Sequence, residues 1–393
     1  MPNKDKNIPK RRFKAFENAD AWELRKLGEL GTLKNGMNFS KDAMGIGFPF
    51  INLQNIFGKN IVDVSQLGLA KASSIQLKNY NLQKGDVLFV RSSVKLEGVG
   101  EAAIVPKNLE NTTYSGFIIR YRDSFGLDYN FKRFIFGTSN IRNQIMSQAT
   151  DSANKNISQQ VLTELDILVP PLLEQNAIGT FFSILDQQIT LHQRKLDKLK
   201  NVKQAYLSEM FPAEGERVPK RRFPGFTDAW ELRKLKLLFI FKYGDGNNNP
   251  SNGGPYPVFG AGGVQGGYTE YNSENSIIIG HMGDAGCVSW GEGKHFVTYN
   301  GTITRPKEEV FTAKFGYYLL SKMNLRQYRG GSGLPFLTYD MLNDMDTIVP
   351  TNKSECDKIS EFFSTLDQQI TLHQRKLEKL KNLKKALLNE LFV

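Results

Sequence analysis

Cysteine is scarce in this sequence: Cys287 and Cys356 are the only two among 393 residues. This count excludes a disulfide scaffold and a four-cysteine zinc site, and it is typical of a reducing cytoplasm. No apolar run approaches the roughly 20 residues needed to span a bilayer. The polar, basic stretch Met1–Phe16 is not followed by the apolar segment of a secretory signal. We therefore expect a cytoplasmic protein with no membrane partner.

Familiar catalytic motifs are also missing. The phosphate loop G-x-x-x-x-G-K-[ST] is absent, since Gly293-Lys294 is followed by His295. Val169–Leu172 lacks both the polar head and the aromatic tail of an amino-methyltransferase motif, and neither H-E-x-x-H nor G-x-S-x-G occurs. We expect no catalytic residue, metal or cofactor in this chain. A nuclease site built from scattered carboxylates stays open.

Positive charge is in excess. The formal net charge is +11, while 40% hydrophobic and 23% charged residues are ordinary for globular domains. A basic balance of this size favours a polyanionic partner, because neutralising phosphates releases counterions. Charge alone does not distinguish a nucleic-acid partner from another kind of partner.

An internal repeat is the strongest feature of the sequence. FFSILDQQITLHQRKLDKLKNVKQAYLSEMF, from Phe181, returns as FFSTLDQQITLHQRKLEKLKNLKKALLNELF, from Phe362, with 24 of 31 positions identical. RRFKAFENADAWELRKL, from Arg11, likewise returns as RRFPGFTDAWELRKL, from Arg221. The chain is therefore two tandem units whose ends agree and whose middles differ. This favours one fold carrying two unlike surfaces over a duplication whose loops drifted freely.

The repeated segments have the four-three spacing of a coiled-coil seam. We predict that these seam residues pack together: Leu185, Ile189, His192, Leu196, Leu199, Leu366, Ile370, His373, Leu377 and Leu380. The polar seam residues, which include Lys203 and Lys384, are expected to set register rather than to bind metal. Packed antiparallel, the helices would act as a ruler between two modules. An alternative to the ruler is that the helices join the chain to a second copy or to another protein. The charged outer faces of the helices are explained by exposure to solvent as well as by contacts to phosphate.

Several side chains suited to base or phosphate contacts occur in the central segment of each repeat unit. In the first, Gly85-Asp86 predicts a turn into a buried strand that ends just before Arg91. Arginine pairs with guanine, and asparagine with adenine. The DNA-binding candidates there are Arg91, Ser92, Ser93, Lys95, Arg120, Arg122, Lys132, Arg133 and Asn140.

The second middle is rich in glycine, which we interpret as tight turns between short strands. It is not a dinucleotide fingerprint, because Gln265 stands where the third glycine would fall. The DNA-binding candidates there are Tyr256, His281, Asp284, Asn300, Arg329 and Ser332.

Together these motifs resemble the specificity (S) subunits of type I restriction–modification systems over nearly the whole chain. The resemblance is carried by the two AWELRKL openings, the strand ends LDILVPP and MDTIVP, Glu174-Gln175 and the paired FFS-x-LDQQI helices. The second copy departs at Glu355-Cys356, where the family usually has Glu-Gln.

The resemblance implies an α+β (mixed α/β) fold, with two globular target-recognition domains separated by two long antiparallel coiled-coil helices in a pseudo-two-fold repeat. Each domain would read one half of a bipartite site in double-stranded DNA. Two methyltransferase subunits and the restriction subunits would be partners, carrying S-adenosylmethionine, Mg and ATP. The expected segments are a basic N-terminus (1–16), recognition domain 1 (17–170), spacer helix 1 (171–212), a linker (213–227), recognition domain 2 (228–350) and spacer helix 2 (351–393).

Two rivals remain. One is a coiled-coil adaptor between proteins, whose basic charge is incidental and which does not read DNA sequence. The other is a stand-alone nuclease or methyltransferase. Salt-dependent binding to duplex DNA separates the first from a DNA reader, and turnover by the purified chain alone would favour the second.

Overall fold

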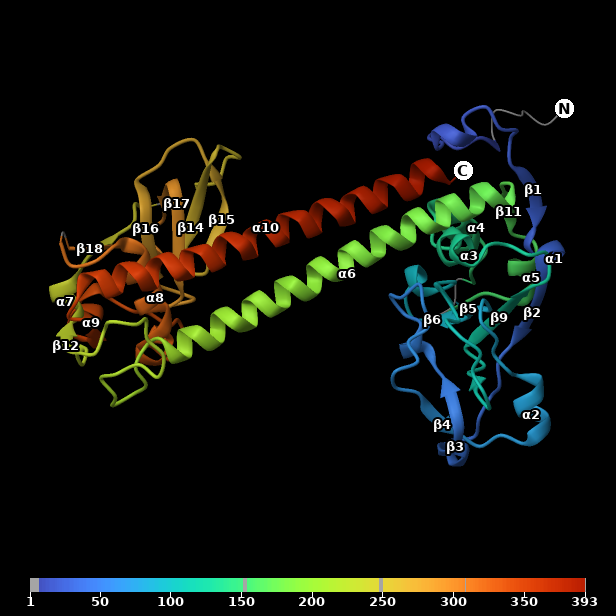
Figure 1. Ribbon diagram of the computed structural model, residues 1–393, viewed down its shortest axis with the longest axis horizontal. Helices are drawn as coiled ribbons and strands as arrows, with labels where there is room; N and C mark the ends of the chain where they lie inside the picture. The colour runs from blue at the N-terminus through green and yellow to red at the C-terminus, as the bar shows by residue number, and fades with distance from the viewer. Residues whose placement is uncertain (1–6, 151–153, 247–249, 308, 393) are drawn as a thin grey trace. The chain divides into compact units, whose positions relative to one another are not determined.

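A computed structural model describes residues 7–150, 154–246, 250–307 and 309–392 (Figure 1). Residues 1–6 of the expected basic N-terminus lie outside the described residues. The chain divides into unit 1 (Met1–Leu191 with Lys376–Val393) and unit 2 (His192–Arg375). Each unit joins a helix-and-sheet module to part of two long helices, α6 (Leu172–Glu209) and α10 (Lys353–Leu391). The predicted mixed fold class with two long helices is confirmed.

Unit 1 is built on a four-stranded antiparallel sheet in the order β2-β9-β5-β7. The predicted buried strand is β5, preceded by Gly85, whose φ of 91° favours glycine. A three-stranded sheet, β4-β3-β8, and the ladders β1-β11 and β10-β6 complete the strands. Strand bounds are β1 Glu23–Lys26, β2 Gly31–Asn35, β3 Met44–Ile51, β4 Gly68–Ala70, β5 Val87–Val90, β6 Ser92–Ser93, β7 Ala102–Ile104, β8 Thr113–Tyr114, β9 Ile118–Asp123, β10 Lys155–Asn156 and β11 Asp166–Val169.

Helices close the core of unit 1. Phe131 of α3 and Phe182 of α6 are buried in one cluster with Phe89 and Tyr121 of the sheet. Burying large aromatic side chains supplies much of the hydrophobic free energy of such a core. Helix bounds are α1 Leu27–Leu30, α2 Ser74–Asn79, α3 Tyr129–Ile135, α4 Ser139–Ser147 and α5 Gln159–Thr163.

Unit 2 carries a larger sheet of six strands in the order β13-β18-β16-β17-β14-β15. Its glycine-rich stretch forms the β14–β15 hairpin, which turns at Ala261 and Gly262 and continues at Gly263 with a φ of 108°. The interpretation as turns between short strands is thus confirmed for this hairpin. Element bounds are β12 Glu231–Lys234, α7 Leu235–Leu238, β13 Phe239–Tyr243, β14 Tyr256–Gly260, β15 Gly263–Tyr268, β16 Ser273–Gly280, β17 Val288–Val297, β18 Gly301–Pro306, α8 Ala313–Lys322, α9 Tyr339–Asp344 and β19 Asp346–Val349.

The long helices run in opposite directions within each unit. In unit 1, Leu185 near the start of α6 packs in one cluster with Leu387 near the end of α10. In unit 2 the order is reversed, and Tyr206 near the end of α6 meets Phe362 of α10, with ring centroids 5.1 Å apart. All ten predicted seam residues are buried or half-buried. An apolar stripe paired in this way no longer faces water.

The polar seam residues of α6 and α10 contact each other or a carboxylate on the opposite helix. In unit 1, Lys384 Nζ lies 2.6 Å from Asp186 Oδ1, and in unit 2 Lys203 Nζ lies 2.5 Å from Asp367 Oδ1. His192 Nδ1 lies 2.9 Å from His373 Nδ1, so one ring must donate and the other accept. Because each contact forms in one register only, these pairs specify how the helices align.

Candidate nucleic-acid interface

A shared hydrogen-bonded frame underlies the two modules. In unit 1, the backbone N–H of Arg91 donates to Phe117 O at 2.8 Å, and Arg91 O accepts from Ile157 N at 3.0 Å. In unit 2, the N–H of His281 donates to Asn300 O at 2.8 Å, and His281 O accepts from Leu337 N at 2.8 Å. Arg91 and His281 therefore occupy the same place in two copies of one frame.

The neighbouring strands match as well. Gly36 follows β2 and donates to Ile118 O at 2.9 Å, while Gly244 follows β13 and donates to Gly301 O at 2.9 Å. A Cβ on Gly36 would lie 2.1 Å from Ser115 O, and one on Gly244 2.3 Å from Thr298 O. Glycine is required at both positions because the backbones approach so closely.

The candidate Arg91 lies directly after β5. Its side chain is half-buried, and Nη1 donates to Gly116 O at 3.3 Å. Ser92 and Ser93 form β6, which pairs with β10, and Lys95 just beyond is exposed. Asn140 is exposed on α4 and accepts from Gln144 Nε2 at 2.9 Å. The structure thus gathers Arg91, Ser92, Ser93 and Lys95 at one strand end, with Asn140 on a separate helix.

Three basic candidates of unit 1 have internal partners instead. Arg120 is 7% exposed and donates to Asn81 O at 2.7 Å, and Lys132 is 6% exposed and pairs with Asp123 at 3.0 Å. Arg122 makes a two-pronged pair with Asp86, which raises the pKa of this guanidinium. Contacts to DNA by these side chains remain untested predictions, but their ion pairs and burial favour a role in holding the module together.

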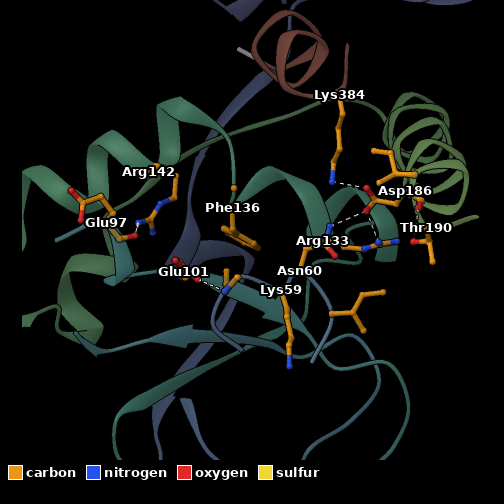
Figure 2. A pocket seen from close by; sticks show the side chains of 15 residues that line it. Lys59, Asn60, Glu97, Glu101, Arg133, Phe136, Arg142, Asp186, Thr190 and Lys384 are labelled. Atoms are coloured by element: carbon orange, nitrogen blue, oxygen red, sulfur yellow. Dashed lines mark hydrogen bonds and ion pairs between the residues drawn. The ribbon is translucent and has the colours of Figure 1, made fainter. Parts of the chain in front are cut away.

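Arg133 lines a cavity of about 660 Å³ beside the long helices of unit 1. Figure 2 shows Arg133, Lys384 and Asn60 pointing at Asp186. Arg133 Nη2 and Lys384 Nζ each lie 2.6 Å from this carboxylate, and Asn60 donates to it at 3.1 Å. Burial lowers the pKa of Arg133. Asp186 holds Arg133 of α3 and Lys384 of α10 together, so the cluster braces α3 against the long helices of unit 1, and a DNA contact by Arg133 remains an untested prediction.

In unit 2 the frame brings together candidates from three segments. His281 is 5% exposed, and its Nδ1 must donate to Leu337 O at 2.9 Å, since a carbonyl only accepts. The ring is thereby fixed with Nε2 as the acceptor in its neutral form. The loop with exposed Arg329 and Ser332 is tied to this strand end by the Met282–Phe336 and Gly330–Phe336 bridges. His281, Asn300, Arg329 and Ser332 thus belong to one local assembly.

The other two candidates of unit 2 lie elsewhere. Tyr256 begins β14, and its ring lies 5.1 Å from that of Tyr271. Asp284 forms an exposed pair with Arg326 at 2.7 Å, which raises the pKa of Arg326. Their place in DNA binding stays a prediction.

The frame also exposes aromatic residues that are not among the predicted DNA-binding candidates. Phe117, next to Arg91, is 57% exposed, and Tyr299 and Tyr339, around His281, are 42% and 39% exposed. Each stands beside a strand end whose position depends on long-range pairing. The only sequence signal was aromatic residues near predicted turns, which is too common to be specific.

Other kinds of site receive no support from the described residues. Among them, no group of three or more His, Cys, Asp or Glu side chains is placed to bind a metal. Within the same ranges, every helix is too short or too polar to cross a membrane.

Known proteins resemble the chain in sequence. Over 191 residues it is 26% identical to the type I restriction enzyme EcoKI specificity subunit of Escherichia coli, a match covering 47% of this chain but only 41% of that protein. It is 22% identical over 398 residues to the putative type I restriction enzyme MjaX specificity subunit of Methanocaldococcus jannaschii, covering 94% of this chain and 92% of that protein.

Solved structures share the fold. The S subunit of a type I restriction–modification system from M. genitalium matches with a TM-score of 0.70 and 18% identity, covering 98% of this chain and 99% of that one. A structure from work on assembly and conformational transition of the type I system matches with a TM-score of 0.53 and 16% identity, covering 94% and 97%. At these identities the likeness shows the fold alone.

The family model for the type I restriction modification DNA specificity domain matches residues 19–201 and again residues 227–382. The two matches fall on the two copies of the repeat and together cover most of the chain. The family predicted from the sequence is therefore confirmed: this chain belongs to the type I restriction–modification DNA specificity family.

Proposed function

We propose that this chain is the DNA-specificity subunit of a type I restriction–modification complex, in which unit 1 reads one half of a bipartite site and unit 2 the other. One observation carries the proposal: the same hydrogen-bonded frame places Arg91 in one unit and His281, with the exposed Tyr299 and Tyr339 beside it, in the other. A guanidinium and an imidazole offer different hydrogen-bonding groups to a base edge. Two unlike readers on one frame fit an asymmetric, two-part target.

The proposed chain carries no catalytic centre. Two methyltransferase subunits would bring S-adenosylmethionine and methylate adenine, and restriction subunits would bring ATP and Mg. The complex would act on double-stranded DNA in the cytoplasm. We further propose 17–170 and 228–350 as the recognition domains and 171–212 and 351–393 as the spacer helices. The apolar seam and the interhelical Lys–Asp pairs support this division.

The decisive experiment is sequencing of methylated adenines in cells that carry this chain with its methyltransferase partner. We expect a motif of two short defined parts separated by a spacer of fixed length and undefined sequence, with one methylated adenine in each part. A single continuous motif, or methylation without sequence preference, would contradict the proposal.

A heptad insertion tests the ruler. Seven residues inserted into α6 lengthen it by about 10 Å, at 1.5 Å per residue. We expect the motif to keep both defined parts while its spacer changes. The same insertion in the connection at 213–219, outside α6, is the control and should leave the spacer as it was. An unaltered spacer in the α6 variant would refute the ruler.

The adaptor alternative is tested by salt. Phosphate contacts make log affinity fall linearly with log salt, and 6–10 contacts give a loss of roughly 10³–10⁵ between 50 and 200 mM. We expect such a slope for duplex DNA with the full chain in its methyltransferase complex. An adaptor would bind its protein partners and show no preference among DNA sequences.

A further inference from the structure

Four aromatic rings cluster where β13, β16 and β18 of unit 2 come together with the start of α9. Tyr243 is the last residue of β13, and its ring centroid lies 4.3 Å from that of His281, 5.7 Å from that of Tyr299 and 4.9 Å from that of Tyr339. Tyr299 also lies 5.6 Å from His281. Tyr243 is thus the centre, with two tyrosines around it that are 42% and 39% exposed.

The fold does not require these rings. Hydrogen bonds of the shared frame align Tyr243 with Asn35, Tyr299 with Gly116 and Tyr339 with Gln159 of unit 1. None of these three unit 1 residues is aromatic, yet the frame forms there with the same backbone bonds. A cluster kept only for core packing would also be buried, whereas its outer rings face solvent. The rings therefore belong to the surface by which the modules differ.

The chemistry of the cluster selects among base features. Tyrosine faces are apolar, and the apolar group displayed in the major groove is the 5-methyl of thymine. Asn300, in the same turn as Tyr299, supplies an amide of the kind that pairs with adenine. An adenine-methylating complex needs an A·T pair in each half-site, so thymine is present. We propose that Tyr299 and Tyr339, supported by Tyr243, contact a thymine methyl in the half-site of unit 2. The inference rests on the proposed function and deepens it.

The test combines protein variants with altered DNA. Once the motif is known, each thymine of the second half-site is replaced in turn by deoxyuridine, which lacks only the methyl. We expect the wild-type chain, in its methyltransferase complex, to bind about fourfold more weakly at one such position, as one lost methyl contact implies. Y299A or Y339A should bind the thymine DNA more weakly and no longer distinguish the two bases.

Conservative and distant variants complete the design. Y299F and Y339F keep the ring face and should still prefer thymine; if they bind thymine and deoxyuridine DNA equally, the preference depends on the hydroxyls and not on the ring faces, and the inference is wrong. Y271A removes another exposed tyrosine of unit 2 and should retain the preference. Hydrogen exchange in β16 and β18 that matches the wild type shows that unit 2 of each variant is folded.

Two failures are distinguishable. A complex that reads its motif but binds thymine and deoxyuridine equally at every position overturns this inference alone. A complex without any sequence preference overturns the proposed function and the inference with it.

Discussion

Units 1 and 2 share side-chain pairs in their helical parts, but in their helix-and-sheet modules they share mainly backbone hydrogen bonds. Their helical parts have similar sequences and share the equivalent pairs Lys384–Asp186 and Lys203–Asp367. Their modules share backbone hydrogen bonds but differ in side chains and in sheet size, with four strands against six. Backbone pairing holds a strand end in place whichever side chain it carries. The comparison teaches that the side chains at the strand ends differ between the units without loss of the frame, whereas the Lys–Asp pairs between the helices are the same in both.

The largest expected effect comes from breaking a buried brace that both units share. Arg12 pairs with Glu174 through two bonds of 2.8 and 2.7 Å, and Arg222 with Glu355 through two of 2.6 and 2.7 Å. Both carboxylates are 1% exposed. R12A or R222A would leave a buried carboxylate without its charged partner. We expect each variant to lower the free energy of unfolding of its own unit by about 3–5 kcal/mol. Hydrogen exchange on peptides from β9 and β18 locates the loss.

Matched controls lie one residue away. Arg11 pairs with Glu390 and Arg221 with Glu209, both at the surface. R11A and R221A should change exchange little, because exposed pairs are screened by solvent. If R12A loosened both units alike, they would unfold as one and the comparison between them would fail.

A smaller and unequal effect is expected at the helix braces. Asp186 receives Arg133, Lys384 and Asn60, whereas Asp367 receives Lys203 and a hydrogen bond of 2.8 Å from Tyr318 Oη. D186N leaves two cations without a charged partner and D367N leaves one. We expect a loss of about 2–3 kcal/mol for D186N and about half of that for D367N.

Denaturant unfolding measures the braces, with exchange assigning each loss to its unit. T190A on the same helix is the control, since Thr190 lines the cavity but bonds only to the backbone of α6. Equal losses for the two aspartates would show that Arg133 contributes nothing to the brace of unit 1.

Substituting the residues proposed to read bases should change the DNA motif that is recognised and leave the stability of the fold unchanged. R91A is expected to relax the motif in one half-site only, and R329A in the other, each by about 1–3 kcal/mol if the arginine contacts a base edge. Methylated-adenine sequencing checks both. R233A, which removes a half-buried arginine paired with Glu231, is the control. If either change weakened all sequences equally, that arginine would be a phosphate contact.

Periodicity and turn chemistry predicted much of this molecule. The heptads specified the two long helices, and Gly85-Asp86 marked the start of β5. The aromatic cluster could not be foreseen, because residues 243, 281, 299 and 339 meet only through strand pairing between distant segments. Conversely, Arg120 and Lys132 looked like surface cations, and only the tertiary structure shows them buried beside their partners. The local sequence pattern predicts an element and its buried face, but it does not predict which strand ends lie close together in the folded chain.

The smallest expected effect is a difference in pH response. All four histidines lie in unit 2, and unit 1 has none. His295 is fully buried between Ser276 Oγ at 2.9 Å and Gly293 O at 2.8 Å, with Arg305 and Glu274 as the nearby charges. Burial lowers its pKa from 6.5, so the unfolded chain binds the proton more readily than the folded one. This destabilisation is absent well above pH 6.5 and grows as the pH falls below that value.

We therefore expect acidification from pH 7 to 5 to speed hydrogen exchange in β16 and β17, after correction for the intrinsic rate, with less change in β5 and β9. H295Q removes the buried ring and should flatten the response of unit 2 without altering that of unit 1. The other three histidines stay in this variant, so a response that persisted undiminished would assign the pH dependence to them. An equal response in unit 1 would instead implicate carboxylates, which both units contain, and would erase the contrast.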